Sequence, residues 1–133
     1  HKATTESSHT QTYASGNVTD GDANTYWESA NNAFPQWCQI DLGSAQTIGR
    51  VVLKLPPATS WATRTQTIAL TGSTDNGTFF TVKAAATYTF DPATGNQVTI
   101  TFPAVSLRYL RITVTTNSGW PAGQLSEAEA YTS

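Results

Sequence analysis

Apolar and polar residues alternate in several short runs of this chain, and this period of two limits the possible folds more than any other feature. Cys38, Ile40 and Leu42 fall on one face of such a run. Ile48–Leu55 is almost entirely apolar, as expected for a central strand that is covered on both faces. The same alternation recurs in three further runs, namely Ile68–Leu70, Val98–Phe102 and Leu110–Val114. No stretch has a helical period, so we expect an all-β protein.

Turn residues separate these runs. Asp75-Asn76-Gly77 stands between Ser73 and Phe79, which predicts a hairpin loop. Repeated turn signals divide the chain into seven or eight short strands. We therefore predict a jelly-roll β-sandwich of about eight antiparallel strands. A length of 133 residues favours a single domain over residues 1–133.

Charge and cysteine content exclude several classes of function. The net charge is −2, and the seven Lys and Arg residues are scattered, so no basic stripe is available for nucleic acid or anionic lipid. Cys38 is the single cysteine, so no internal disulfide can form. No apolar run approaches the ~20 residues that cross a bilayer. The chain starts without a signal peptide, and we expect it to be one module of a longer secreted protein.

An acidic turn near the start of the chain has the donors that a hard cation needs. Asp20, Asp22 and Thr25 place three oxygen-bearing side chains around Gly21. Calcium takes six to eight oxygen ligands, some of them backbone carbonyls that a compact glycine turn can direct inward. The alternative is a metal-free turn stabilised by Asp and Asn side chains. The spacing alone leaves both interpretations open.

Five segments together resemble a known family over nearly the whole chain. The sequence resembles the discoidin domain, also called the coagulation-factor C-type domain, and its sugar-binding branch, carbohydrate-binding module family 32. The segments that carry the resemblance are Asp20-Gly21-Asp22 with Thr25 and Trp27, Gln36–Gly43, Ser73–Gly77, Arg108–Arg111 and Ser126–Tyr131.

This resemblance implies a structural calcium ion that joins the first loop to the last strand. Such a link would close the longest loop of the domain. The ligands it implies are the carbonyls of Asn17 and Ser126 and the side chains of Asp20, Asp22, Thr25 and Glu127.

The four tryptophans divide into two groups. Trp27 and Trp37 occupy positions that the family uses for packing, and Trp37 opens a core strand. Trp61 and Trp120 lie in polar loops, where few apolar neighbours are available. An exposed indole suits a pyranose ring, whose C–H groups pack on the π-face. We predict that Trp61 and Trp120 bind sugar, and the resemblance gives Trp120 a stacking position. The alternative for both is that the ring caps the end of the sandwich.

Other loop residues could complete a sugar site. Amide and guanidinium groups match the hydroxyl pairs of a sugar. Arg64 could instead be a buried structural cation at the end of the sheet, and Tyr26 is predicted to pack. Together with the two tryptophans, the predicted carbohydrate-binding residues are Tyr13, Glu28, Asn31, Phe34, Arg64 and Asn117.

The sequence contains no convincing catalytic group. A glycosidase needs two facing carboxylates ~5–9 Å apart, and the chain has nine acids, three of which the calcium hypothesis uses. We predict a secreted, monomeric, non-catalytic carbohydrate-binding module that attaches a bacterial glycoside hydrolase to a glucan, galactan or chitosan. The alternative is a discoidin domain for cell adhesion or lipid head groups. The sequence does not identify the sugar.

Overall fold

The computed structural model describes residues 3–22, 24–57 and 61–132, and strands dominate these residues. No helix in this part of the chain has the length and apolar character needed to cross a membrane. In chain order the elements are β1 (Ala3–Glu6), η1 (Ser15–Thr19), β2 (Trp27–Glu28), β3 (Gln36–Lys54), β4 (Arg64–Ser73), β5 (Phe80–Phe90), η3 (Pro92–Thr94), β6 (Gln97–Asn117), β7 (Gln124–Leu125) and β8 (Glu127–Tyr131).

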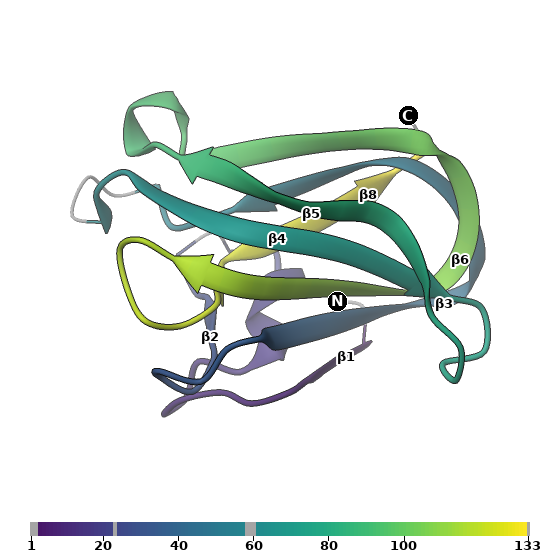
Figure 1. The fold of residues 1–133 in the computed structure, drawn as a ribbon, viewed down its shortest axis with the longest axis horizontal. Helices are drawn as coiled ribbons and strands as arrows, with labels where there is room; N and C mark the ends of the chain where they lie inside the picture. Colours follow the sequence, from purple (N-terminus) through teal and green to yellow (C-terminus); the bar gives the residue numbers. More distant parts are fainter. Residues whose placement is uncertain (1–2, 23, 58–60, 133) are drawn as a thin grey trace.

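Two long strands, β3 and β6, connect the two layers of a β-sandwich (Figure 1). Residues 36–41 of β3 pair with 109–114 of β6, in a layer with the strand order β1-β3-β6-β4-β5. Residues 50–54 of β3 pair with 97–101 of β6 on one side and with β8 on the other. All of these pairings are antiparallel. The predicted all-β jelly-roll sandwich is therefore confirmed.

The prediction of uniformly short strands was wrong for β3 and β6. The runs Cys38–Leu42 and Ile48–Leu55 were expected to be separate, but the ladder continues between them and shifts register between Asp41 and Gln46. Gly43 lies in this interval with a φ of 89°, a conformation that costs glycine little. A bulge bends a strand without ending it, and the turn residues there belong to such a bend.

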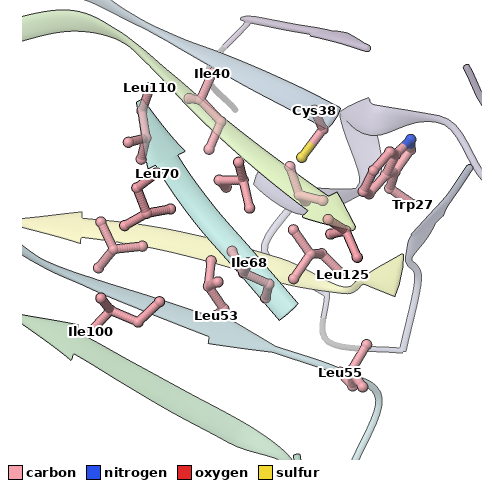
Figure 2. Packing of buried hydrophobic residues seen from close by; sticks show 14 of the residues in the cluster. Trp27, Cys38, Ile40, Leu53, Leu55, Ile68, Leu70, Ile100, Leu110 and Leu125 are labelled. Atoms are coloured by element: carbon pink, nitrogen blue, oxygen red, sulfur yellow. The ribbon is translucent and has the colours of Figure 1, made fainter. Parts of the chain in front are cut away.

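The core lies between the layers (Figure 2). Cys38 and Ile40 of β3 belong to the same buried cluster as Ile68 and Leu70 of β4, and all four are buried, as the alternation predicts. Ile112 of β6 lies between the two strands and pairs with both Cys38 and Leu70. Burial raises the pKa of the Cys38 thiol, which therefore stays protonated. The other buried apolar side chains of the cluster are Val18, Trp27, Ile48, Val51, Leu53, Leu55, Phe90, Ile100, Leu107, Leu110, Ile112, Val114 and Leu125.

Trp37 lies outside this core. It alternates with Cys38 and is half-buried on the outer face of the layer, where the Arg111 guanidinium lies 4.0 Å from its ring centre and 4.1 Å from that of Phe79. Trp37 therefore packs as predicted, but on the surface of the sheet and not in the core.

The predicted hairpin between β4 and β5 is confirmed. The Asp75 carboxylate accepts hydrogen bonds from the backbone N–H groups of Gly77 and Thr78.

Candidate functional site

A pocket of about 360 Å³ opens at the end of the sandwich where the longer loops gather. This volume lies at the lower end of the ~300–1,000 Å³ range of small-molecule sites. Five of the eight described lining residues are among the predicted carbohydrate-binding residues, and the other three were not predicted. The lining residues are Gln11, Tyr13, Tyr26, Glu28, Trp61, Arg64, Trp120 and Gln124.

The floor of the pocket is a two-stranded ribbon formed by β2 and β7. Trp27 pairs with Leu125, and Glu28 pairs with Gln124. Successive side chains of a strand point to opposite faces, so Trp27 and Leu125 enter the core while Glu28 and Gln124 line the pocket. Gly123 makes this possible, because a Cβ atom there would lie 3.0 Å from the Trp27 ring.

Gln124 joins the two charged groups of the pocket. Its Nε2 donates to Glu28 Oε1 at 2.7 Å, and its Oε1 accepts from Arg64 Nη1 at 2.8 Å and from Asn117 Nδ2 at 3.0 Å. The buried Gln66 side chain fixes the Gln124 backbone through two hydrogen bonds of 2.9 and 3.0 Å. The carboxylate and the guanidinium are thus held at fixed positions, with opposite charges on either side of one amide.

Arg64 is the first residue of β4 and lies at the end of the sheet. Its Nη2 donates to the Trp61 carbonyl, and its guanidinium carbon lies 4.9 Å from the Trp61 ring centre. Burial lowers the pKa of Arg64, and the nearby Glu28 carboxylate partly offsets this. An arginine remains protonated under such conditions. Arg64 is therefore a structural cation that also lines the pocket.

Three aromatic rings form one wall. Tyr13 and Tyr26 stack with their ring centres 4.5 Å apart and an interplanar angle of 14°. Trp61 meets Tyr26 edge-on at 4.7 Å and packs against the hydrophobic core. Burial, followed by the contact with Tyr13 and the charge of Glu28, raises the pKa of Tyr26, so its hydroxyl stays protonated. Tyr26 packs against its neighbours, as predicted, and it also lines the pocket.

Trp120 forms the outer rim and is 47% exposed. Asn117 holds its loop, since Oδ1 accepts from the backbone N–H of Gly119 at 2.9 Å and of Trp120 at 3.3 Å. The Trp120 Nε1 donates to Asn31 Oδ1 at 3.2 Å. Gly119 lies against Arg64, and a Cβ atom there would lie 2.9 Å from the Arg64 side chain. The exposed indole is thus fixed on both sides.

The structure brings most of the predicted sugar-binding residues together. Asn31 and Asn117 support the Trp120 loop and do not line the pocket, and Phe34 is 37% exposed outside it. The five predicted residues that do line it are Tyr13, Glu28, Trp61, Arg64 and Trp120.

Three lining residues were missed. Tyr26 and Glu28 flank the buried Trp27, so strand alternation carried a signal for Tyr26. Gln124 required the pairing of two segments that are 96 residues apart. Gln11 lies in a loop with a φ of 53°, and nothing in the sequence marks it.

The acidic turn lies next to the last strand, as η1 packs against β8. The carboxyl groups of Asp20 and Glu127 interact directly, and Glu127 Oε1 is buried without a hydrogen-bond partner among the described residues. Burial and then the proximity of Asp20 raise the pKa of Glu127 to about 7. Burial opposes ionisation of Asp20, but hydrogen bonds from the Thr25 hydroxyl and the Asp22 backbone keep its pKa below the ordinary value.

The oxygens of Asp20 and Glu127 are of the kind that a hard cation binds, but among the described residues only these two carboxylates lie together. In the part of the chain that the structure describes, no three Asp, Glu, His or Cys side chains gather at one point. Asp22 is exposed and its carboxylate accepts from the Asn24 backbone, so it does not join the Asp20–Glu127 pair. Asn17 donates from Nδ2 to the Tyr26 carbonyl, and Ser126 is fully buried beside Glu127.

Comparison with known proteins places the chain in a family. The family model described as "NedA-like, galactose-binding domain", of the F5/F8 type C class, matches residues 17–112. The chain belongs to this F5/F8 type C family. This discoidin-like family is the one that the sequence motifs resemble, so that prediction is confirmed. A comparison with curated protein sequences gives no match.

Solved structures of carbohydrate-binding modules share the fold of this F5/F8 type C domain. The family 32 module of AlyQ, in complex with 4,5-unsaturated mannuronic acid, is 27% identical with a TM-score of 0.80, and the match covers 98% of this chain and 95% of that one. Chitosan-binding module 2 of a chitosanase/glucanase from Paenibacillus sp. IK-5, in complex with chitotriose, is 32% identical with a TM-score of 0.72, covering 98% and 95%.

A third solved structure is similar to this chain in fold only, because its sequence identity is low. The family 32 module of C. perfringens NanJ, in complex with galactose, is 19% identical with a TM-score of 0.80, and the match covers 96% of this chain and 91% of that one.

Proposed function

We propose that this F5/F8 type C domain is a non-catalytic carbohydrate-binding module and that its pocket binds a polysaccharide. The observation that carries the proposal is the fixed, 47% exposed Trp120 ring on the rim of a pocket with a polar floor. Sugar rings have apolar C–H faces and polar edges, so they need both kinds of surface. The pocket provides them side by side.

The two kinds of surface have separate tasks. Trp120 offers a flat apolar face, and its contacts with Asn31 and Asn117 reduce the entropy that it loses on binding. Arg64, Glu28 and the tyrosine hydroxyls present donors and acceptors to the sugar hydroxyls. A single shallow site of this kind predicts weak binding, with a Kd on the order of 10 μM to 1 mM.

The arrangement does not support glycoside hydrolysis. That reaction uses a pair of carboxyl groups on either side of the scissile bond, ~5–9 Å apart. Of the described residues that line the pocket, Glu28 alone has a carboxylate, and it is hydrogen-bonded to Gln124. Binding without catalysis is therefore the function that this geometry supports best.

The relatives support the binding proposal. The AlyQ and Paenibacillus modules were solved with sugar ligands, and the latter comes from a chitosanase/glucanase. By this likeness the chain would be one module of a secreted, bacterial glycoside hydrolase, with a glucan, galactan or chitosan as its ligand. As a monomer it would act by holding the catalytic domain close to its substrate.

We further propose a structural calcium ion at the acidic turn. The donor set fits, because the Asp20 and Glu127 carboxylates meet and Glu127 has a buried oxygen without a hydrogen-bond partner in the described part of the chain. Thr25 and the carbonyls of Asn17 and Ser126 would complete the shell. When bound, calcium would neutralise the two carboxylates and fasten η1 to β8.

Affinity electrophoresis against laminarin, an α-1,3-glucan, a galactan, soluble chitosan, alginate and pectin tests the proposed function. We expect at least one polysaccharide to retard the module. Sedimentation with phosphatidylserine vesicles tests the adhesion or lipid alternative on the same preparation. Retardation by no polysaccharide together with co-sedimentation would contradict the proposal and favour that alternative.

A further inference from the structure

A second, smaller cavity adjoins the main pocket and is not part of the function proposed above. Its volume is about 180 Å³. It lies on the side of the acidic turn, and two of its residues, Tyr13 and Tyr26, also line the main pocket. In the described part of the chain, the lining residues are Thr12, Tyr13, Asn17, Asn24, Thr25 and Tyr26.

The shared tyrosines form a ridge between the two cavities. Their rings stack almost in parallel, with centres 4.5 Å apart, and Trp61 supports Tyr26 from the core side. A supported stack of two rings is a rigid apolar surface, and both cavities open beside it. A ligand that lies against the ridge from one cavity is therefore next to the other.

The smaller cavity has a mainly apolar wall with a few hydroxyl and amide groups, a combination that suits a neutral sugar unit. Apart from the tyrosines, its described lining consists of two threonines and two asparagines. The side chains of Asn17 and Thr25 are hydrogen-bonded to the Tyr26 carbonyl and to Asp20, so Thr12 and Asn24 are the polar residues that would meet a ligand. Hydroxyl and amide groups match sugar hydroxyls. Thr12 and Asn24 are exposed at its opening and accessible to a ligand.

The volume indicates that this cavity works with the main pocket and not alone. About 180 Å³ is below the ~300–1,000 Å³ of independent small-molecule sites, whereas the main pocket is within that range. An adjoining cavity that shares the Tyr13–Tyr26 wall gives the next unit of a polymer an apolar face to lie against.

We propose that the smaller cavity is a second sugar subsite, so that the module binds a chain of at least two sugar units across the Tyr13–Tyr26 ridge. This inference rests on the proposed function, because the first unit occupies the main pocket beside Trp120. It adds that the ligand is an oligosaccharide segment and not a single terminal sugar. It also assigns Thr12 and Asn24 to binding.

Calorimetric titration with glucose, galactose and glucosamine, and with laminari-, galacto- and chito-oligosaccharides up to the hexasaccharide, tests the proposal. In the series that binds, we expect the affinity of the unmodified module to rise from the monosaccharide to the short oligosaccharides. Asn24→Ala should weaken oligosaccharide binding by roughly threefold to tenfold, as expected for one or two lost hydrogen bonds, and leave monosaccharide binding unchanged. Thr12→Phe, which fills the cavity, should do the same.

The controls separate this inference from the proposed function. Thr74→Ala, an exposed threonine in the β4–β5 turn, should leave both affinities unchanged. Equal affinity for monosaccharide and oligosaccharide, or an equal loss of both in Asn24→Ala, would overturn the second subsite while the module still binds sugar. If the unmodified, folded module binds no sugar in any of these series, this inference is wrong, and the proposed function is wrong as well if no polysaccharide of the electrophoresis panel retards the module.

Discussion

The two faces of the β2–β7 ribbon differ more than any other pair of adjacent surfaces in this domain. On the inner face, Trp27 and Leu125 are fully buried. On the outer face, their neighbours Glu28 and Gln124 form the polar floor of the pocket beneath Trp120. Residues adjacent in sequence therefore serve different ends, because a strand directs them to opposite sides.

The different packing of the two faces indicates that stability and binding can be changed separately in this domain. The inner face is tightly packed, as shown by the 3.0 Å separation between a Cβ atom at Gly123 and the Trp27 ring. The outer face borders the pocket, where Glu28 and Gln124 are 8% and 3% exposed and the rim residue Trp120 is 47% exposed. Substitutions on the inner face should destabilise the fold, and substitutions at the exposed rim should weaken binding.

The largest effect is expected for Trp27→Ala. Removing a fully buried indole from the core should lower the free energy of unfolding by about 3–5 kcal/mol. Urea denaturation followed by circular dichroism measures this change. A loss of less than ~1 kcal/mol would show that the inner face is not the stabilising one.

Removal of calcium should have the next largest effect. A ligand held by the native state alone, at one hundred times its Kd, stabilises a protein by about 2.7 kcal/mol. We expect chelation to lower the Tm by several degrees and calcium to restore it. Asp20→Asn should make the Tm insensitive to chelator, and a Tm that never responds to chelation would contradict the proposed calcium site.

Trp120→Ala should weaken polysaccharide binding by at least ~2 kcal/mol, about thirtyfold, because the ring is the central apolar contact. The Tm should stay nearly unchanged, since the side chain is 47% exposed. Affinity electrophoresis and thermal denaturation of the same sample measure both. A large fall in Tm would show instead that the ring belongs to the core.

The smallest effect should distinguish two residues of one loop. Asn31→Ala removes the acceptor of the Trp120 Nε1–H and should weaken binding by about 0.5–1.5 kcal/mol. Phe34→Ala changes a residue outside the pocket and should leave affinity within about twofold. A larger loss of affinity in Phe34→Ala than in Asn31→Ala would indicate that the ligand binds near Phe34 and not over the ribbon.

Much of the fold could be predicted from local patterns. The alternation around Cys38 and Ile40 and the turn at Asp75 depend on neighbouring residues, and both predictions were confirmed. The continuous course of β3 could not be predicted, because a glycine bend such as that at Gly43 has the same local sequence as a turn that ends a strand.

The candidate site was predictable to the extent that its residues are locally unusual. Trp120 stood out because it is an aromatic residue between glycine and proline. Gln124 did not, because its position depends on Glu28 and Arg64, which are 96 and 60 residues away. Tertiary pairing of this kind leaves no signal in a single sequence.

The indole N–H signals of the four tryptophans test the central claim most directly. Each gives a separate resonance in a ¹⁵N–¹H correlation spectrum, which single Trp→Phe variants can assign. Titration with a polysaccharide that retards the module should shift the Trp120 and Trp61 signals and leave Trp27 and Trp37 in place. Saturable binding that leaves Trp120 unmoved, or that shifts Trp37, would place the ligand elsewhere and contradict the account.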